Sequence, residues 1–231
     1  MNNIPSPAGI ELLLSSDRQA ILGRLSAGLT HVMNNVLGGV IGQIDLLMIT
    51  NGGPNLQKDL DQVIQICDEG VNFAKAISKV ISVFNDRNAP DTNEILKNAI
   101  LLISRIYRRA GLQAVLKYPS ITPTTAKSDL FVQAAIHLLL MAFEDEVKNR
   151  QIGTKPVFDV ALSFDAQNIF MSINNINLAS VATEFPSQYE GNEYHSWVVH
   201  QVVEQGNASI SYQADERICR VTWPLQEINL K

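Results

Sequence analysis

The sequence predicts an α+β protein in two parts, a long helical hairpin followed by a sandwich in which helices pack on one face of a mixed sheet. Three observations predict this class. The chain shows only helical periodicity up to about residue 86. After residue 91, short alternating strand patterns separate the helical ones. Finally, 231 residues with 46% hydrophobic and 18% charged residues supply ample material for a globular core.

Charge balance and cysteine content narrow the function classes. A net charge of -5 disfavours a nucleic-acid-binding protein, because phosphate binding requires clustered lysine and arginine. Cys67 and Cys219 lie far apart, which is typical of a protein in a reducing cytosol and not of a disulfide-stapled secreted domain. We expect no apolar stretch of membrane-helix length, and the first residues lack a signal-type core. The prediction is a cytoplasmic protein that binds no membrane.

The first part of the chain predicts a helical hairpin over residues 16–86, preceded by a tail at 1–15. Ser16 or Asp17 is suited to cap a first helix that continues to about Thr50. A glycine and proline turn at 51–54 separates it from a second helix, which runs from about Leu56 to Phe84. Apolar residues form one continuous stripe on the first helix, at Leu22, Leu25, Leu29, Met33, Val36, Val40, Ile44 and Leu47.

The length of these helices predicts a homodimer. A helix of about 30 residues extends roughly 45 Å, and a lone antiparallel pair of that length buries its apolar stripes poorly. A second copy of the chain would supply the missing partners. We therefore expect two hairpins to form a dimeric four-helix bundle.

The second part, residues 91–231, alternates helices with strands. Helices are predicted at about 93–110, 127–149 and 194–205, and the middle one is apolar enough to be buried. Strands are predicted at 112–118, 157–164, 169–173, 208–213 and 218–223, with an irregular stretch at 174–192. This order predicts an α/β sandwich joined to the hairpin by a linker at 85–90.

The polar face of the first helix has an unusual composition. Spacings of three and four place on it one imidazole, two carboxamides and several glycines, in the set Arg24, Ala27, Gly28, His31, Asn34, Asn35, Gly38, Gly42 and Asp45. Each glycine costs a helix interior about 1 kcal/mol relative to alanine. Two interpretations account for this cost: close packing of another helix, or a shallow surface on which a partner docks around His31.

The segment from Gly23 to Leu47 resembles the phosphoacceptor helix of two-component histidine kinases. The family pattern is H-E-x-N-N-P-L, then small residues, then an acidic residue with two leucines, and it is matched by His31, Asn34, Asn35, Leu37, Asp45, Leu46 and Leu47. The segment is also similar to the dimerisation helix of histidine phosphotransferases of the ChpT type. The second domain follows the order of elements of a kinase ATP-binding domain, so the resemblance covers nearly the whole chain.

Four departures from the kinase pattern imply a degenerate histidine-kinase-type ATPase domain. Val32 replaces the acidic residue that acts as base beside the histidine, and Met141 replaces an asparagine that helps hold magnesium. The adenine-binding box reads as 173–179 without aspartate or glycine, and the phosphate loop at 191–197 keeps one glycine beside Tyr194 and Trp197. The expectation is that the chain binds no ATP, no other cofactor and no metal, and that magnesium belongs to the partner.

The resemblance and its departures imply a histidine phosphotransferase in a phosphorelay. His31 would accept a phosphoryl group from the phospho-aspartate of a response-regulator receiver domain and pass it to another receiver, without ATP. Asn35 would orient the phosphoryl group, and Arg24 would offset its charge. The receiver would dock on the small and polar residues Ala27, Gly28, Asn34, Gly38 and Gly42.

Two alternatives stay open: a non-catalytic dimeric pseudokinase scaffold that binds receivers or kinases, and an atypical histidine kinase. Among the other candidates, His137 lies in an apolar helical run and is predicted to be a buried, hydrogen-bonded core residue. His195 and His200 are spaced i, i+5, which does not suit a helical metal site. The carboxylates at 144–146 are predicted to form a solvated face.

Overall fold

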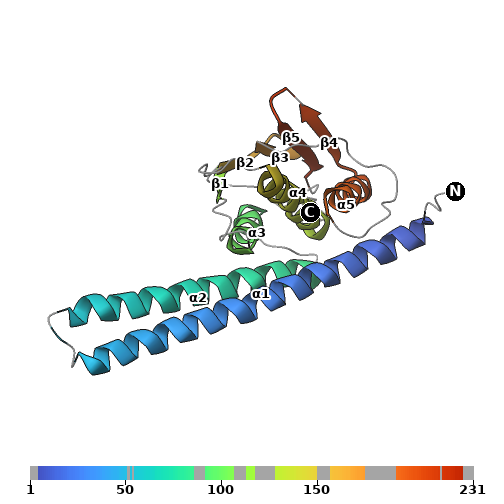
Figure 1. Ribbon diagram of the computed structural model, residues 1–231. Helices are drawn as coiled ribbons and strands as arrows, with labels where there is room; N and C mark the ends of the chain where they lie inside the picture. The colour runs from blue at the N-terminus through green and yellow to red at the C-terminus, as the bar shows by residue number, and fades with distance from the viewer. Residues whose placement is uncertain are drawn as a thin grey trace, which may run out of the picture.

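The computed structural model describes residues 5–50, 53, 55–85, 92–106, 113–117, 128–149, 157–174, 191–213 and 215–225. Within these ranges, two long antiparallel helices form a hairpin, and an α/β sandwich lies against one side of it (Figure 1). This arrangement confirms the α+β class. Of the linker predicted at 85–90, Asn85 is the last residue of the second helix, and 86–90 lie outside the described residues, as does most of the irregular stretch at 174–192.

The hairpin consists of α1 (Pro7–Ile49) and α2 (Leu56–Asn85), and α1 begins earlier than predicted. The Ser6 hydroxyl accepts a hydrogen bond from the Gly9 amide at 3.2 Å. Pro7 occupies the first helical position, where an N–H group would have no acceptor within the helix. The helix start predicted at Ser16 or Asp17 is therefore wrong, and residues 7–15 are helix and not tail. Asp17 does not cap a helix because its carboxylate is buried against other elements.

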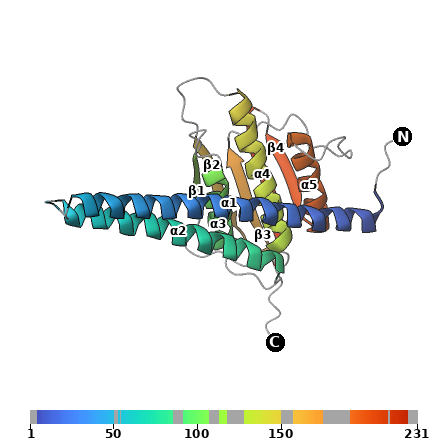
Figure 2. The ribbon, with the colours of Figure 1, turned by 60° about the horizontal axis from the view of Figure 1, so that its bottom comes forward.

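The two helices of the hairpin lie side by side from the turn onward, and the N-terminal part of α1 extends beyond the end of α2 (Figure 2). A Cβ atom placed on Gly70 would lie 2.9 Å from the Val36 side chain, so only glycine permits this approach. Nearer the turn, the Gln43 amide donates to the Gln62 side-chain oxygen at 3.2 Å. The hairpin extends well beyond the sandwich (Figure 1).

The sandwich has three helices between the hairpin and a five-stranded sheet (Figure 1). Its helices are α3 (Thr92–Ile106), α4 (Ser128–Asn149) and α5 (Gly191–Gln205). Its strands are β1 (Gln113–Lys117), β2 (Val157–Phe164), β3 (Asn168–Asn174), β4 (Ser209–Gln213) and β5 (Ile218–Pro224). The sheet order is β1-β2-β3-β5-β4, with β1 parallel to β2 and the other pairs antiparallel, so the mixed sheet is confirmed.

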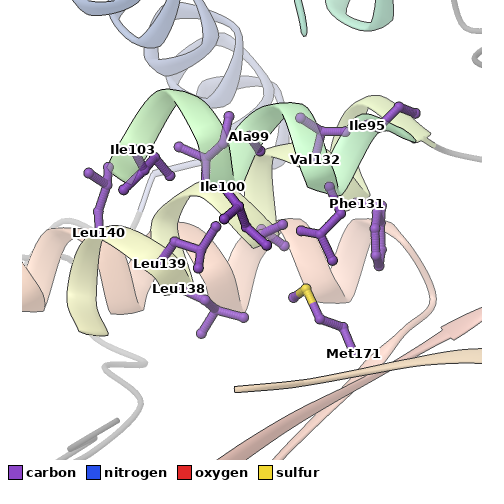
Figure 3. Packing of buried hydrophobic residues seen from close by; sticks show 14 of the residues in the cluster. Ile95, Ala99, Ile100, Ile103, Phe131, Val132, Leu138, Leu139, Leu140 and Met171 are labelled. Carbon is purple, nitrogen blue, oxygen red and sulfur yellow. The ribbon is translucent and has the colours of Figure 1, made fainter. Parts of the chain in front are cut away.

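The core of the sandwich is built around α4. From Leu130 to Phe143 this helix is buried on every side, because α5, α3 and α2 pack around it and the sheet covers its remaining face. Figure 3 shows Ile95, Ala99 and Ile103 of α3 beside residues of α4, with Met171 of β3 below them. On the sheet side, the Phe131 ring meets the buried Trp223 ring edge to face, with centroids 5.7 Å apart.

Helix α1 is long and apolar enough, by length and composition alone, to cross a membrane. Its most apolar 18-residue window has a mean hydropathy of 1.5, and none of that window is buried. The prediction that the chain holds no such stretch is therefore wrong: the segment between Arg24 and Asp45 carries no charged side chain, although His31 and two asparagines interrupt it. Core helices of soluble proteins and signal sequences share these properties, so one such helix is weak evidence for a membrane span.

Candidate functional site

His31 lies near the middle of α1 with its side chain exposed. One turn further on, the Asn35 side-chain amide nitrogen lies 3.4 Å from the His31 Nε2 atom. When this amide donates, Nε2 is the unprotonated ring nitrogen and Nδ1 carries the proton. The nitrogen that has a lone pair for attack on an electrophile is then the one that Asn35 orients.

The surface around His31 is open. A Cβ atom placed on Gly28, Gly38 or Gly42 would meet nothing within 4 Å. Ala27 and Asn34 are also exposed. Close packing within the chain therefore does not explain these glycines, in contrast to Gly70, where the backbone approaches a neighbouring side chain.

Arg24 shares the helix face of His31 but lies seven residues away, which is about 10 Å along the helix axis. It lines a cavity of about 260 Å³ between α1 and the sandwich, together with Asp17, His137, Tyr194 and His195. Its predicted role as charge support for His31 stays a prediction. In the structure, Arg24 lies instead at the joint, by which we mean the region where α1 of the hairpin meets α4 and α5 of the sandwich.

That joint contains a buried polar cluster. The Asp17 carboxylate accepts from His137 Nε2 at 2.8 Å, from the Gln133 amide at 2.7 Å and from the Tyr194 hydroxyl at 2.7 Å. His137 Nδ1 lies 2.7 Å from His195 Nδ1, and His195 Nε2 lies 3.3 Å from a Glu144 oxygen. Asp17, Gln133, His137 and His195 are all less than a tenth exposed. The prediction of a buried, hydrogen-bonded His137 is confirmed.

The pKa values in this cluster shift for identifiable reasons. Burial raises the pKa of Asp17, but the hydrogen bonds that its carboxylate accepts from His137, Tyr194 and Gln133 outweigh burial and leave the pKa below its usual value. Burial lowers the pKa of His137, against the opposite influence of Asp17. Asp17 is therefore ionised and His137 is neutral.

Sequence reasoning missed Asp17, His195 and Glu144 as members of one cluster. Glu144 was expected on a solvated face, but its side chain is only 24% exposed and lies beside His195. The sequence offers one signal for Asp17: it precedes Arg24 by seven residues, and Arg24 precedes His31 by seven. This spacing places Asp17 on the helix face that carries His31. No spacing along the chain indicates that its partners lie more than a hundred residues away.

Two positions that differ from the kinase pattern have clear structural surroundings. Met141 is 3% exposed and packs in the apolar core of α4. The segment 191–197, expected as a shortened phosphate loop, is instead the first two turns of α5, and Trp197 is 3% exposed. Most of the altered adenine-binding box, from 175 to 179, lies outside the described residues. Among the described residues, no group of three or more His, Cys, Asp or Glu side chains is placed to hold a metal ion.

Solved structures with a similar fold are histidine kinases and a phosphotransferase. The histidine kinase AdeS of Acinetobacter baumannii is 11% identical over 86% of this chain and 98% of its own, with a TM-score of 0.43. A bacterial phosphotransferase is 12% identical over 88% of this chain and 95% of its own, with a TM-score of 0.43. The histidine kinase domain of the blue-light activated kinase EL346 of Erythrobacter litoralis is 15% identical over 89% of this chain and 94% of its own, with a TM-score of 0.41.

These neighbours are of the class that the sequence pattern resembles. No protein-family model matches the sequence, and no curated protein matches it either. At this identity and TM-score, the structural likeness carries no argument about function.

Proposed function

We propose that this chain is a histidine phosphotransferase of a phosphorelay, with His31 as the phosphoacceptor. The observation that carries the proposal is the exposed His31 imidazole on α1, with the Asn35 amide at its Nε2 atom and open glycine positions on either side. A receiver domain has to bring its phospho-aspartate within bonding distance of a nucleophile. A histidine that projects from a smooth, unobstructed helix permits this approach.

The reaction needs little from the protein beyond positioning. The Nε2 lone pair of His31 attacks the phosphorus atom in line with the aspartyl oxygen. The N–P bond forms as the bond between phosphorus and that oxygen breaks, and the aspartate carboxylate leaves with the electron pair. The Nδ1 proton is released to solvent, and the reverse sequence passes the phosphoryl group to a second receiver. Magnesium bound by the receiver would balance the phosphoryl charge.

The working unit that we propose is a homodimer. Large apolar side chains on the outer side of the hairpin are 40% or more exposed in the single chain: Leu37, Ile41, Ile44 and Met48 on α1, and Leu60, Ile64 and Val71 on α2. Their spacings of mostly three, four and seven residues form a stripe on each helix, which suits a second hairpin. Asp59, Asp61 and Asp68 flank this face on α2, and carboxylates are unfavourable in lipid. A four-helix bundle therefore accounts for the face better than a membrane does.

The donor that we propose is a phosphorylated receiver and not ATP. Met141 is buried where the kinase pattern has a magnesium-binding asparagine, and a thioether is a poor ligand for this hard cation. The helical segment 191–197, with Trp197 buried in it, offers no glycine-rich loop to surround phosphates. These features support a phosphotransferase that takes its phosphoryl group from receiver domains.

A transfer assay tests the phosphoacceptor. Purified receiver domains are phosphorylated with acetyl phosphate and mixed with the full chain, its His31→Gln variant and its His200→Gln variant. We expect the wild type and His200→Gln to acquire label that is stable in base and labile in acid, as a phosphoramidate is. His31→Gln should acquire less than about 1% of it. Label on His31→Gln would refute the role of His31. Receiver binding without transfer to the wild type would favour the scaffold, and saturable ATP binding by calorimetry would favour the atypical kinase.

Sedimentation in detergent-free buffer tests the dimer. We expect a mass of twice 25.5 kDa for the wild type. Ile41→Glu should reduce it to that of one chain, because a carboxylate would be buried in the bundle. Val147→Glu, at an exposed apolar residue of α4 outside the hairpin, should leave the dimer intact. A monomeric wild type, or equal masses for the two variants, would contradict the bundle.

A further inference from the structure

The buried cluster at the joint forms one continuous chain of four titratable side chains. Its three links join Asp17 to His137 at 2.8 Å, His137 to His195 at 2.7 Å, and His195 to Glu144 at 3.3 Å. The chain begins on α1, passes through α4 and α5, and returns to α4. The inner residues are buried, whereas the Glu144 side chain is 24% exposed and gives the chain a contact with solvent.

The number of protons in this chain follows from its geometry. Each link needs one proton between its two heavy atoms, so three links need three protons. Two neutral imidazoles carry one ring proton each, and two ionised carboxylates carry none. With both rings neutral, one link therefore lacks a proton.

The distances and the surroundings of Asp17 indicate which link this is. Asp17 is an ionised acceptor, because it also receives hydrogen bonds from the Tyr194 hydroxyl and the Gln133 amide. His137 must then donate from Nε2, which leaves its Nδ1 atom as an acceptor. His195 donates to it from its own Nδ1 atom, and the bare Nε2 of His195 faces the Glu144 oxygen. This link is also the longest of the three, at 3.3 Å.

We propose that the chain from Asp17 to Glu144 is a proton-operated latch, which takes up one proton at the link between His195 and Glu144 and thereby fixes α5, the helix whose Tyr194 binds Asp17 of the hairpin. This inference does not depend on the function proposed above. A proton on His195 Nε2 converts two facing lone pairs into a charge-assisted hydrogen bond between α5 and α4. It also reduces the net charge of the four side chains from -2 to -1, counted from two ionised carboxylates.

The other charges around the chain are consistent with this proton uptake. Among the described residues, Arg24 of α1 acts electrostatically on His137, and its positive charge opposes a second one on that ring. Arg18 of α1 is engaged with Asp129 of α4 at 2.6 Å. Burial lowers the pKa of His137, so this ring remains neutral and the proton resides at the outer end. Tyr194 of α5 adds a hydroxyl, which it donates to Asp17.

The latch acts on the joint through α5. Tyr194 precedes His195 on this helix and binds Asp17 on α1, so a link that fixes His195 to Glu144 also fixes the residue that holds α5 on the hairpin. Asp17 shares its helix face with Arg24 and His31.

Nitrogen NMR of the full chain with ¹⁵N-labelled histidine tests this inference between pH 5.5 and 8.5. At alkaline pH we expect His195 to carry its proton on Nδ1 and His137 on Nε2. As the pH falls, His195 should become an imidazolium while His137 stays neutral. In Glu144→Gln this transition should move to lower pH, because the facing negative charge is removed.

Glu204→Gln, at an exposed carboxylate near the end of α5, is the matched control and should leave the transition where the wild type has it. Three results would overturn the latch. They are a neutral His195 ring that carries its proton on Nε2, proton uptake by His137, or a protonation transition at the same pH in both variants. The first two need no variant, so the inference stays testable even if Glu144→Gln does not fold.

Discussion

Asp17→Ala is the change that most directly tests how the two parts of the chain are held together. The Asp17 side chain is 4% exposed and accepts three side-chain hydrogen bonds, from His137 at 2.8 Å and from Gln133 and Tyr194 at 2.7 Å each. Alanine removes all three acceptor positions. It also leaves a small space beside the cavity between α1 and the sandwich.

The three donors lose unequal amounts of stabilisation. His137 is fully buried and finds no other acceptor for Nε2, which costs about 2–3 kcal/mol. The Gln133 amide keeps a second bond, to the Leu14 carbonyl at 3.2 Å, and Tyr194 is partly exposed, so each contributes about 0.5–1 kcal/mol. The sum is about 3–5 kcal/mol, because three buried or partly buried donors lose one shared acceptor group.

Urea denaturation followed by circular dichroism measures this free energy of unfolding. Asp45→Ala, an exposed carboxylate on the same helix, is the control and should change it by less than about 0.5 kcal/mol. Asp17→Asn keeps an acceptor oxygen and should fall between the two. If Asp17→Ala unfolds within about 1 kcal/mol of the control, the carboxylate does not hold the joint and the reasoning is refuted.

Three further predictions concern pH, packing and thiol reactivity. Because the pKa of Asp17 lies below its unfolded value of 3.8, its stabilisation is present above that pH and is lost as the pH falls through the folded value, so Asp17→Asn should flatten the acid limb of the stability curve. Gly206→Ala would set a Cβ atom against the fully buried Trp223 ring, and a loss of about 2–3 kcal/mol in thermal or urea unfolding is expected; a loss under about 0.5 kcal/mol would contradict the packing. Burial raises the pKa of the Cys219 thiol to about 12, so a maleimide should label exposed Cys67 in the native protein and Cys219 only after denaturation, as mass spectrometry would show.

The regular elements could be predicted from the sequence because their signals are local. The start of α2 at Leu56 and the bounds of β2 agree with the apolar periodicity and the turn residues around them. The start of α1 could not be predicted as well, because Asp17 has the chemistry of a helix cap and Ser6 has it too. Only partners distant in the chain decide that Asp17 is buried in the helix interior.

The candidate site also has one part that the sequence predicts and one part that it does not. His31, Asn35 and the glycines lie on one helix, so their spacing is sufficient to place them on one face, and the structure leaves that face open. Nothing in the sequence connects Glu144 with His195. Glu144 was predicted to be a solvated carboxylate, and His195 was predicted not to form a metal site with His200. Their contact at 3.3 Å depends on how α4 packs against α5.

By itself, the sequence determined the two-part α+β organisation, the long hairpin and the gathering of His31, Asn35 and the glycines on one helix face, since helical and strand periodicity depend on neighbouring residues. The tertiary structure alone decided that Asp17, His137, His195 and Glu144 form one buried chain, and that Arg24 lines the cavity at the joint. Hydrogen bonds between side chains more than a hundred residues apart form only after the core has packed, because burial makes an unpaired polar group costly and so selects its partner.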